Sequence, residues 1–201
     1  MTGKILTRVY PNLPIDKKEV LRYAYDRGGS AEVSDILESV IEESHGIFTP
    51  KVCYCEFDIK SSTDGLDLGF TKTDSAALAK NLSGCEKAVL FAATVGSGVD
   101  RIMSKYEIIS PIRALLLQAL GTERIEALAD AFCNDVAKAK EAGGFITTPR
   151  FSPGYADLPL ALQRDIFRVL DCPKKIGLAL NESLIMSPTK SITAIIGLKR
   201  P

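Results

Sequence analysis

Residues 150–159, RFSPGYADLP, combine groups that can bind a ligand with a backbone that has few accessible conformations. Arg150 is a permanent cation whose planar guanidinium suits a carboxylate. Pro153 lacks an N–H group and restricts the residue before it, whereas Gly154 can adopt a positive φ. Tyr155 adds an aromatic face and a hydroxyl group. We therefore expect a rigid, sharply bent loop that could bind a ligand carrying a carboxylate.

The same loop has two interpretations. In the first, main-chain groups of Ser152 and Gly154 bond a heterocycle while Arg150 binds a carboxylate. In the second, the loop is a proline-rich connector between helices, and Arg150 pairs with a nearby acid of the protein. The chemistry of the residues leaves both open.

Other catalytic patterns are missing from the sequence. The chain has one histidine, His45, and no G-x-S-x-G motif, so Ser–His and Cys–His catalysis are not expected. A zinc site would need nearly all of the cysteines, so we interpret them as reduced residues in small core positions. These cysteines are Cys53, Cys55, Cys85, Cys133 and Cys172.

Gly96 and Gly98 form a G-x-G pattern after an apolar run at 88–95. Backbone N–H groups at the mouth of a helix can receive an anion, which gives this pattern a functional interpretation. The dinucleotide-binding motif, however, requires a third glycine where this chain has Arg101. A structural turn is the favoured interpretation.

The charge balance argues against some partners. The chain has 25 basic and 25 acidic residues, so no overall field attracts nucleic acid or a membrane surface. Its amino terminus lacks an apolar core of signal-peptide length, and no later run approaches a membrane span. We expect a cytoplasmic protein that binds neither nucleic acid nor membrane.

Hydrophobic periodicity predicts the elements that position this loop. Helices are expected at 16–26, 31–46, 75–82, 99–141 and 159–171, with a break in the long helix near Pro111. Strands are expected at 51–59, 66–70 and 88–95, followed by a hairpin at 183–198 around the turn SPTK. Helices and strands interleave without a repeat or linker, so residues 1–201 are predicted to form a single α/β or α+β domain.

Three stretches together resemble a known family. The motif RFSPGY has a proline four residues on, follows the helical stretch RIEALADAF and precedes NESLIMSPTKSITAIIG. In this context it resembles the activation domain of cobalamin-dependent methionine synthase, as does AVLFAATVGSGVDR. The resemblance covers about 87–197, and residues 1–85 match loosely. It implies an α+β fold: a central, largely antiparallel twisted sheet with flanking helices.

The resemblance implies a binding site for S-adenosylmethionine in the 150–159 loop. Arg150 would bind the methionine carboxylate of the ligand. Ser152 and Gly154 would supply main-chain contacts to its adenosine part. Tyr155 would lie near the face shared with cobalamin.

Two acids complete the implied site. Glu126 matches a family acid near the amino group of the ligand, and Asp16 matches another. Each also has a structural interpretation, as a helix-surface charge for Glu126 and as the N-cap of the first helix for Asp16. A sulfonium ligand with an amino acid end needs one fixed cation and nearby acids, which these residues supply.

The implied function is reactivation of a methyltransferase in trans. A stand-alone protein of this type would bind S-adenosylmethionine and dock over the cobalamin of a methionine synthase that lacks its own activation domain. With one electron from flavodoxin or another reductase, the cobalamin would be remethylated. The protein itself needs no general base, because the cofactor performs the chemistry.

Two rival hypotheses remain. The family domain continues past the final β-rich stretch into a segment with a ligand-contacting tyrosine, and the sequence ends at Pro201. One rival is therefore a non-enzymatic docking module for a corrinoid protein, with a degenerate ligand site. The other is an independent S-adenosylmethionine methyltransferase, which would need a base and a substrate pocket that the sequence does not indicate.

Overall fold

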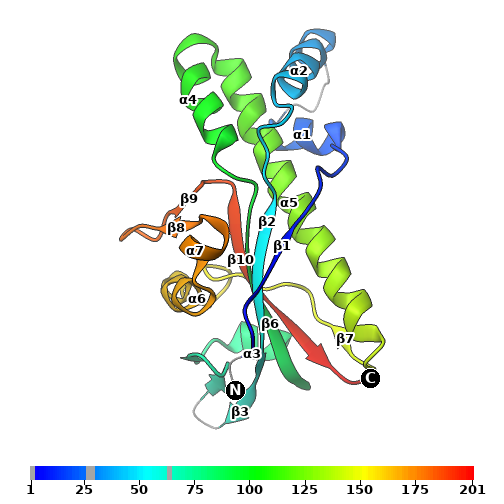
Figure 1. The fold of residues 1–201 in the computed structure, drawn as a ribbon, viewed down its shortest axis with the longest axis vertical. Helices are drawn as coiled ribbons and strands as arrows, with labels where there is room; N and C mark the ends of the chain where they lie inside the picture. The colour runs from blue at the N-terminus through cyan, green and yellow to red at the C-terminus, as the bar shows by residue number, and fades with distance from the viewer. Residues whose placement is uncertain (1–2, 26–29, 63–64) are drawn as a thin grey trace.

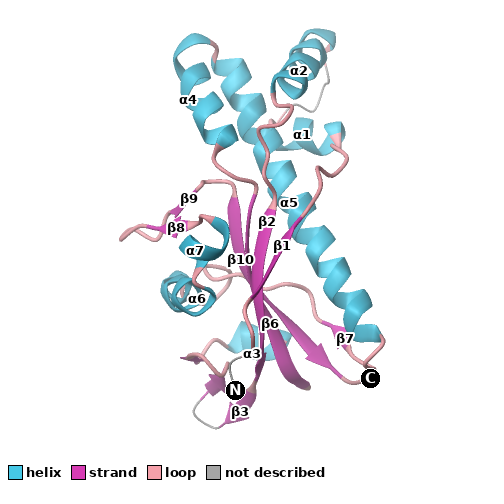
Figure 2. Cartoon of the chain, viewed as in Figure 1, coloured by secondary structure: helices cyan, strands magenta, loops and turns pink. Residues whose placement is uncertain are grey.

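The core of the molecule is a five-stranded antiparallel sheet, seen nearly edge-on in Figures 1 and 2. The computed structural model describes residues 3–25, 30–62 and 65–201. Within them the strand order is β1-β2-β6-β10-β7, and every neighbouring pair is antiparallel. The strands are β1 (Leu6–Val9), β2 (Lys51–Asp58), β6 (Cys85–Thr94), β10 (Ser191–Lys199) and β7 (Ile146–Thr147).

The apolar run at 88–95 forms the central strand because it is buried on both faces of the sheet. β6 pairs with β2 on one side, where Leu90 faces Cys55, and with β10 on the other. Side chains alternate across the sheet, so Leu90 packs in one apolar cluster and its neighbour Phe91 in another. Each face of the sheet therefore needs its own cover.

One face is covered by α5 (Pro111–Glu141), the 31-residue helix that runs along most of the molecule in Figure 1. Phe132 of α5 packs against Tyr54 and Phe91, with ring centroids 5.0 and 4.8 Å apart. The preceding helix, α4 (Gly98–Ile109), ends at Ser110, and Pro111 opens the first turn of α5. The predicted break in the long helix is confirmed.

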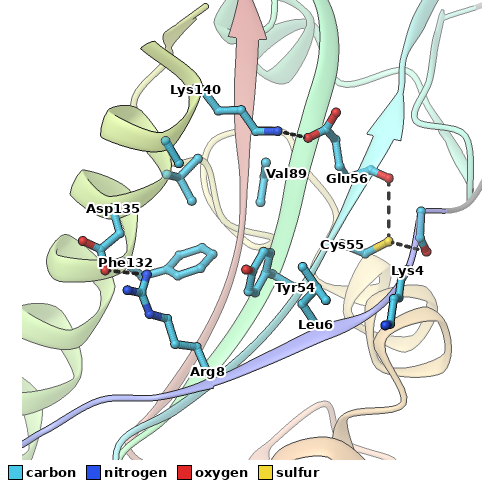
Figure 3. Close-up of a pocket in the computed structure, with 13 residues that line it drawn as sticks. Lys4, Leu6, Arg8, Tyr54, Cys55, Glu56, Val89, Phe132, Asp135 and Lys140 are labelled. Atoms are coloured by element: carbon cyan, nitrogen blue, oxygen red, sulfur yellow. Dashed lines mark hydrogen bonds and ion pairs between the residues drawn. The ribbon is translucent and has the colours of Figure 1, made fainter. Parts of the chain in front are cut away.

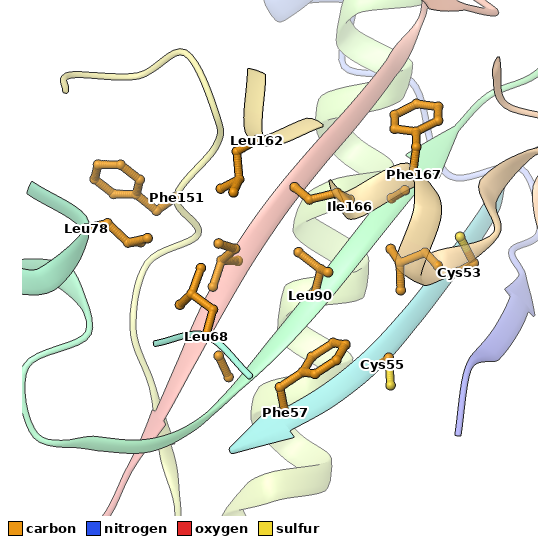
Figure 4. Packing of buried hydrophobic residues seen from close by; sticks show 14 of the residues in the cluster. Cys53, Cys55, Phe57, Leu68, Leu78, Leu90, Phe151, Leu162, Ile166 and Phe167 are labelled. Carbon is orange, nitrogen blue, oxygen red and sulfur yellow. The ribbon is translucent and has the colours of Figure 1, made fainter. Parts of the chain in front are cut away.

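The opposite face is covered by the short helices η1 (Leu160–Leu162), α6 (Gln163–Leu170) and α7 (Cys172–Ile176). Figure 4 shows Ile166 and Phe167 of α6 over Leu90 and the strands beside it. Cys53 of β2 and Cys172 of α7 are free thiols buried here, with sulfur atoms 3.9 Å apart. The pKa of the Cys172 thiol is raised, first by its hydrogen bond with the Cys53 thiol and second by burial.

A helical layer extends beyond the sheet at the top of Figure 1. It contains α1 (Lys17–Tyr23), α2 (Ala31–Glu43), α4 and the first turns of α5. Val20, Val40, Leu117 and Leu120 are fully or almost fully buried in its core. This layer places α1 against the middle of α5.

Shorter elements close the ends of the sheet. They are β3 (Lys60–Ser62), β4 (Gly65–Asp67), β5 (Lys72–Thr73), α3 (Ala76–Asn81), β8 (Ala179–Leu180) and β9 (Met186–Ser187). The predicted hairpin at 183–198 is wrong, because β9 pairs with β8 whereas β10 pairs with β6 and β7. The predicted α+β fold with an antiparallel sheet and flanking helices is confirmed.

The glycines after β6 have a steric role. Gly96 has φ +87°, and a Cβ there would collide with Thr49 Oγ1. A Cβ on Gly98 would lie 2.3 Å from the Ile47 carbonyl oxygen and 2.9 Å from its Cβ. The close approach of the chain before β2 accounts for both residues, which supports the interpretation of a structural turn.

Candidate functional site

The middle of α5 carries three acids on one face: Glu123, Glu126 and Asp130. Their spacing of three and four residues places them one above another along the helix. Glu123 is buried, whereas Glu126 and Asp130 have partly exposed side chains. Apolar neighbours such as Leu128 and Phe132 hold the other face of α5 on the sheet, so this acidic face stays fixed in direction.

Arg150 reaches the acidic face of α5 from the loop that follows β7. Phe151 exchanges two main-chain hydrogen bonds of 2.9 Å with Ile195 of β10, which anchors the loop beside the sheet. Arg150 Nη2 then lies 2.6 Å from Glu126 Oε2, and Nη1 bonds Asp130. The structure thus brings Arg150 and Glu126 together.

The electrostatics of Arg150 follow from these partners. Burial by itself would lower the pKa of the guanidinium, but the hydrogen bond and charge of Asp130 and the charge of Glu126 outweigh it. The pKa therefore lies above its ordinary value, and the side chain is a fixed cation.

The loop after Arg150 is bent as the sequence predicts. Gly154 has φ +87°, and its N–H donates to the Leu158 carbonyl at 2.8 Å. The Ser152 carbonyl accepts from the Tyr155 N–H at 3.2 Å. Because these groups are used within the loop, a main-chain contact from Gly154 to a ligand must use its carbonyl oxygen. The Tyr155 ring is exposed and contacts the edge of Phe151, with centroids 5.3 Å apart.

Asp16 lies on the far side of the same acidic face. It is the N-cap of α1, as predicted: its Oδ1 accepts from the N–H groups of Lys18 and Glu19 at 3.0 and 3.2 Å. Its own N–H donates to Glu123 Oε1 at 3.1 Å. Asp16 is thereby tied to α5.

A groove of about 330 Å³ lies between α1 and α5. Five acids line it, namely Asp16, Glu19, Glu123, Glu126 and Asp130, and Pro14, Tyr23 and Ala127 complete the lining. We call it the acidic groove. It unites the two predicted acids, Asp16 and Glu126, and Arg150 joins it through its ion pairs. Ser152, Gly154 and Tyr155 lie on the continuing loop and do not line the groove.

Sequence reasoning missed Glu123 and Asp130, which line the groove with Glu126. Their i, i+3 and i+7 spacing with Glu126 was an available signal, because it places the three carboxylates on one helical face. It also missed Glu19, which follows Asp16 in the first turn of α1 and pairs with Arg22.

A larger cavity, of about 370 Å³, lies between β1, β2 and α5 (Figure 3). Tyr54, Val89 and Phe132 form its apolar floor, and ion pairs flank it: Arg8 with Asp135 and Lys140 with Glu56. None of the predicted site residues lines this cavity. The acidic groove is the better candidate for the ligand site, because the predicted acids Asp16 and Glu126 line it and the larger volume of the other cavity indicates no binding chemistry.

Within residues 3–25, 30–62 and 65–201, no group of three or more His, Cys, Asp and Glu side chains is arranged to hold a metal ion. No helix in this part of the chain is long and apolar enough to cross a membrane.

Comparisons with known proteins bear on the fold and on the family of the chain. The chain resembles a crystal structure of the MetH reactivation domain bound to AdoHcy, with a TM-score of 0.69 and 18% identity over 97% of this chain and 78% of that one. No curated protein matches its sequence. A family model, described as the activation domain of vitamin B12 dependent methionine synthase, matches residues 76–200. This match includes α5 and the 150–159 loop, and the chain belongs to that family of activation domains.

Proposed function

We propose that this protein binds S-adenosylmethionine at the acidic groove and supports the reductive remethylation of cobalamin on a partner methionine synthase. The observation that carries the proposal is the ion-pair cluster of Arg150 with Glu126 and Asp130, at the edge of a groove lined by acids. Family membership supplies the class of reaction.

The amino acid end of the ligand fits this cluster by exchange of partners. Its carboxylate would take the guanidinium of Arg150, and its ammonium group would take Glu126 or Asp130. Each ion pair that opens is replaced by another of the same type, so no charge is left alone. The half-exposed acids let solvent and ligand compete for these positions.

The sulfonium charge explains why acids outnumber cations in the groove. Asp16 makes no ion pair within the described part of the chain and uses Oδ1 to cap α1, so its Oδ2 is available to a cationic ligand. A positive sulfur near these carboxylates is favoured over a neutral one by Coulomb attraction. The site should therefore prefer S-adenosylmethionine to S-adenosylhomocysteine.

The chemistry belongs to the partner's cofactor. Cobalamin with one electron from flavodoxin or another reductase would accept the methyl group of the ligand, leaving S-adenosylhomocysteine. The contribution of this chain is to hold the ligand by Arg150 and the acids, while the exposed ring of Tyr155 marks the side that faces the partner.

Titration calorimetry tests the site. Wild-type protein should bind S-adenosylmethionine saturably, and Arg150→Ala should weaken binding about tenfold to a hundredfold, as expected for a lost charged hydrogen bond. Arg168→Ala removes an exposed arginine paired with Asp165 and should bind as wild type. Equal affinity of wild type and Arg150→Ala would overturn the assignment.

The same ion pairs favour a second candidate function. Arg150 is already satisfied by two acids without a ligand, as in a docking module whose ligand site has degenerated. Such a module would capture a corrinoid protein but show no heat of binding with S-adenosylmethionine, either alone or with the corrinoid protein present.

A further inference from the structure

A buried ion pair lies beside the acidic groove, between adjacent residues of α5. Arg124 Nε lies 2.5 Å from Glu123 Oε2, and Nη2 lies 2.5 Å from Oε1, so the two side chains meet in a bidentate pair. Both residues are buried. Burying two charges is costly, and an apolar pair of similar volume is often as stable. The pair therefore calls for a reason beyond stability.

The other hydrogen bonds of this pair all go to one segment of main chain. Arg124 Nη1 donates to the Leu13 carbonyl at 2.5 Å, and Nη2 donates to the Pro14 carbonyl at 2.6 Å. Glu123 Oε1 accepts from the Asp16 N–H at 3.1 Å. Three main-chain groups within four residues are thus fixed by two side chains.

The two ends of that segment have other hydrogen bonds, since the Tyr10 N–H donates to the Pro50 carbonyl at 3.0 Å and Asp16 caps α1, but its middle depends on the clamp. Residues 10–16 connect β1 to α1 and contain Pro11 and Pro14, which lack N–H groups. They form no regular secondary structure. Yet Pro14 and Asp16 form one wall of the acidic groove, opposite the acids of α5. The family match begins only at residue 76, so the match does not include this wall.

We propose that the Glu123–Arg124 pair is a clamp that positions Asp16 across the groove from Glu126. Glu123 and Arg124 are positioning residues, and Asp16 is the group that meets the cationic part of the ligand. This assignment rests on the proposed binding of S-adenosylmethionine.

The clamp depends on the shape of the guanidinium as well as its charge. One planar group serves two carbonyls and a carboxylate at once, which the compact ammonium group of lysine cannot do in the same geometry. Arg124→Lys keeps the buried pair charged on both sides but removes the paired contacts to Leu13 and Pro14. It therefore separates positioning from charge balance.

The test is a double-mutant cycle in the full-length protein, with Arg124→Lys, Asp16→Ala and the two combined. Calorimetry with S-adenosylmethionine should give a loss of about tenfold for each single variant. The combined variant should be no weaker than Asp16→Ala, because the clamp acts through Asp16. Arg113→Lys, on the same helix but paired with Glu43, should bind as wild type.

Hydrogen exchange provides a readout that needs no ligand. A peptide covering 11–23 should exchange faster in Arg124→Lys than in wild type or Arg113→Lys, while a peptide from β6 should not change. Losses of affinity that add in the combined variant, or unchanged exchange at 11–23, would overturn the clamp. If wild type binds no S-adenosylmethionine, the proposed function fails, and the exchange result alone decides whether the clamp holds the segment.

Discussion

Arg124 and Arg150 both pair with carboxylates on the same stretch of α5, but they differ in access to solvent. The side chains of Arg124 and Glu123 are 7% and 6% exposed. Those of Arg150, Glu126 and Asp130 are 25%, 38% and 64% exposed. The first cluster also binds main-chain carbonyls, whereas the second consists of side chains alone.

This difference separates a structural cluster from an exchangeable one. A buried charge that loses its partner stays unsolvated, so the closed cluster holds its arrangement. A partly exposed pair contributes little to stability, because water replaces either partner at small cost. Identical chemical groups can therefore fix a chain segment at one position of α5 and, one turn further on, form ion pairs that the proposed ligand could exchange.

The largest expected effect is at the closed cluster. Arg124→Met leaves Glu123 buried without a partner and should lower the free energy of unfolding by about 3–5 kcal/mol. The double variant Glu123→Met/Arg124→Met removes both charges and should recover most of that loss. Chemical denaturation measures both. A loss for Arg124→Met no greater than that of the exposed control Arg168→Met would remove the distinction between the clusters.

The open cluster should show the reverse pattern. Arg150→Ala should change the free energy of unfolding by less than about 1 kcal/mol, since both of its ion pairs reach solvent. Its effect should fall on S-adenosylmethionine affinity instead. Denaturation and calorimetry on the same sample decide the point: a large loss of stability in Arg150→Ala would place it with the structural cluster.

The two acids around Arg150 should differ by their exposure. Glu126→Gln should weaken ligand binding about tenfold. Asp130→Asn should weaken it less, because the Asp130 side chain is the more exposed and its charge is better screened. Measuring the affinities of both variants at low salt and at 0.5 M salt, where the Debye length is roughly 4 Å, provides the comparison. A larger loss for Asp130→Asn would make Asp130 the main partner of the ligand's ammonium group.

Lys190 is a buried cation that forms a hydrogen bond to a hydroxyl group in place of an ion pair, so its charge should lower the free energy of unfolding. Its ammonium group bonds Thr122 Oγ1 at 3.0 Å, and burial lowers its pKa while the charge of Asp100 raises it. The folded state therefore binds fewer protons than the unfolded state in the alkaline range. The free energy of unfolding should rise with pH up to the ordinary lysine pKa of 10.5.

Lys190→Met should abolish that rise. The variant should be more stable than wild type at neutral pH, and its advantage should shrink as the pH increases. Thermal denaturation between neutral and alkaline pH measures the difference, with Lys174→Met as an exposed control. A pH-independent advantage would mean that packing, and not charge, sets the cost of Lys190.

Local sequence signals predicted much of this arrangement. The break at Pro111, the buried strand at 88–95 and the positive φ of Gly154 follow from local preferences of these residues. Asp16 was predicted as an N-cap and is one. The family resemblance pointed to the 150–159 loop, to Glu126, which pairs with Arg150 of that loop, and to Asp16 on the far side of the acidic groove.

What the sequence concealed depends on contacts between distant residues. The hairpin prediction failed because β10 pairs with β6, about a hundred residues earlier, and not with its neighbour β9. From the sequence, Arg124 is an ordinary charged residue of a helix, because its contact with the Leu13 carbonyl joins residues more than a hundred positions apart. Asp130 was overlooked although its spacing from Glu126 was visible, because its partner Arg150 lies twenty residues away.

The buried thiols of Cys53 and Cys172 can report when the helices that cover them move away from the sheet. Both thiols are buried in the layer of α6 and α7, and the pKa of the Cys172 thiol is raised. An alkylating reagent therefore cannot react with them while this layer is closed. Cys85 and Cys133 are partly exposed and provide an internal reference for reagent access. The alkylation rate of Cys53 and Cys172, compared with that of Cys85 and Cys133, would therefore measure how often the helices that cover one face of the sheet move away from it. The measurement needs no label added to the chain.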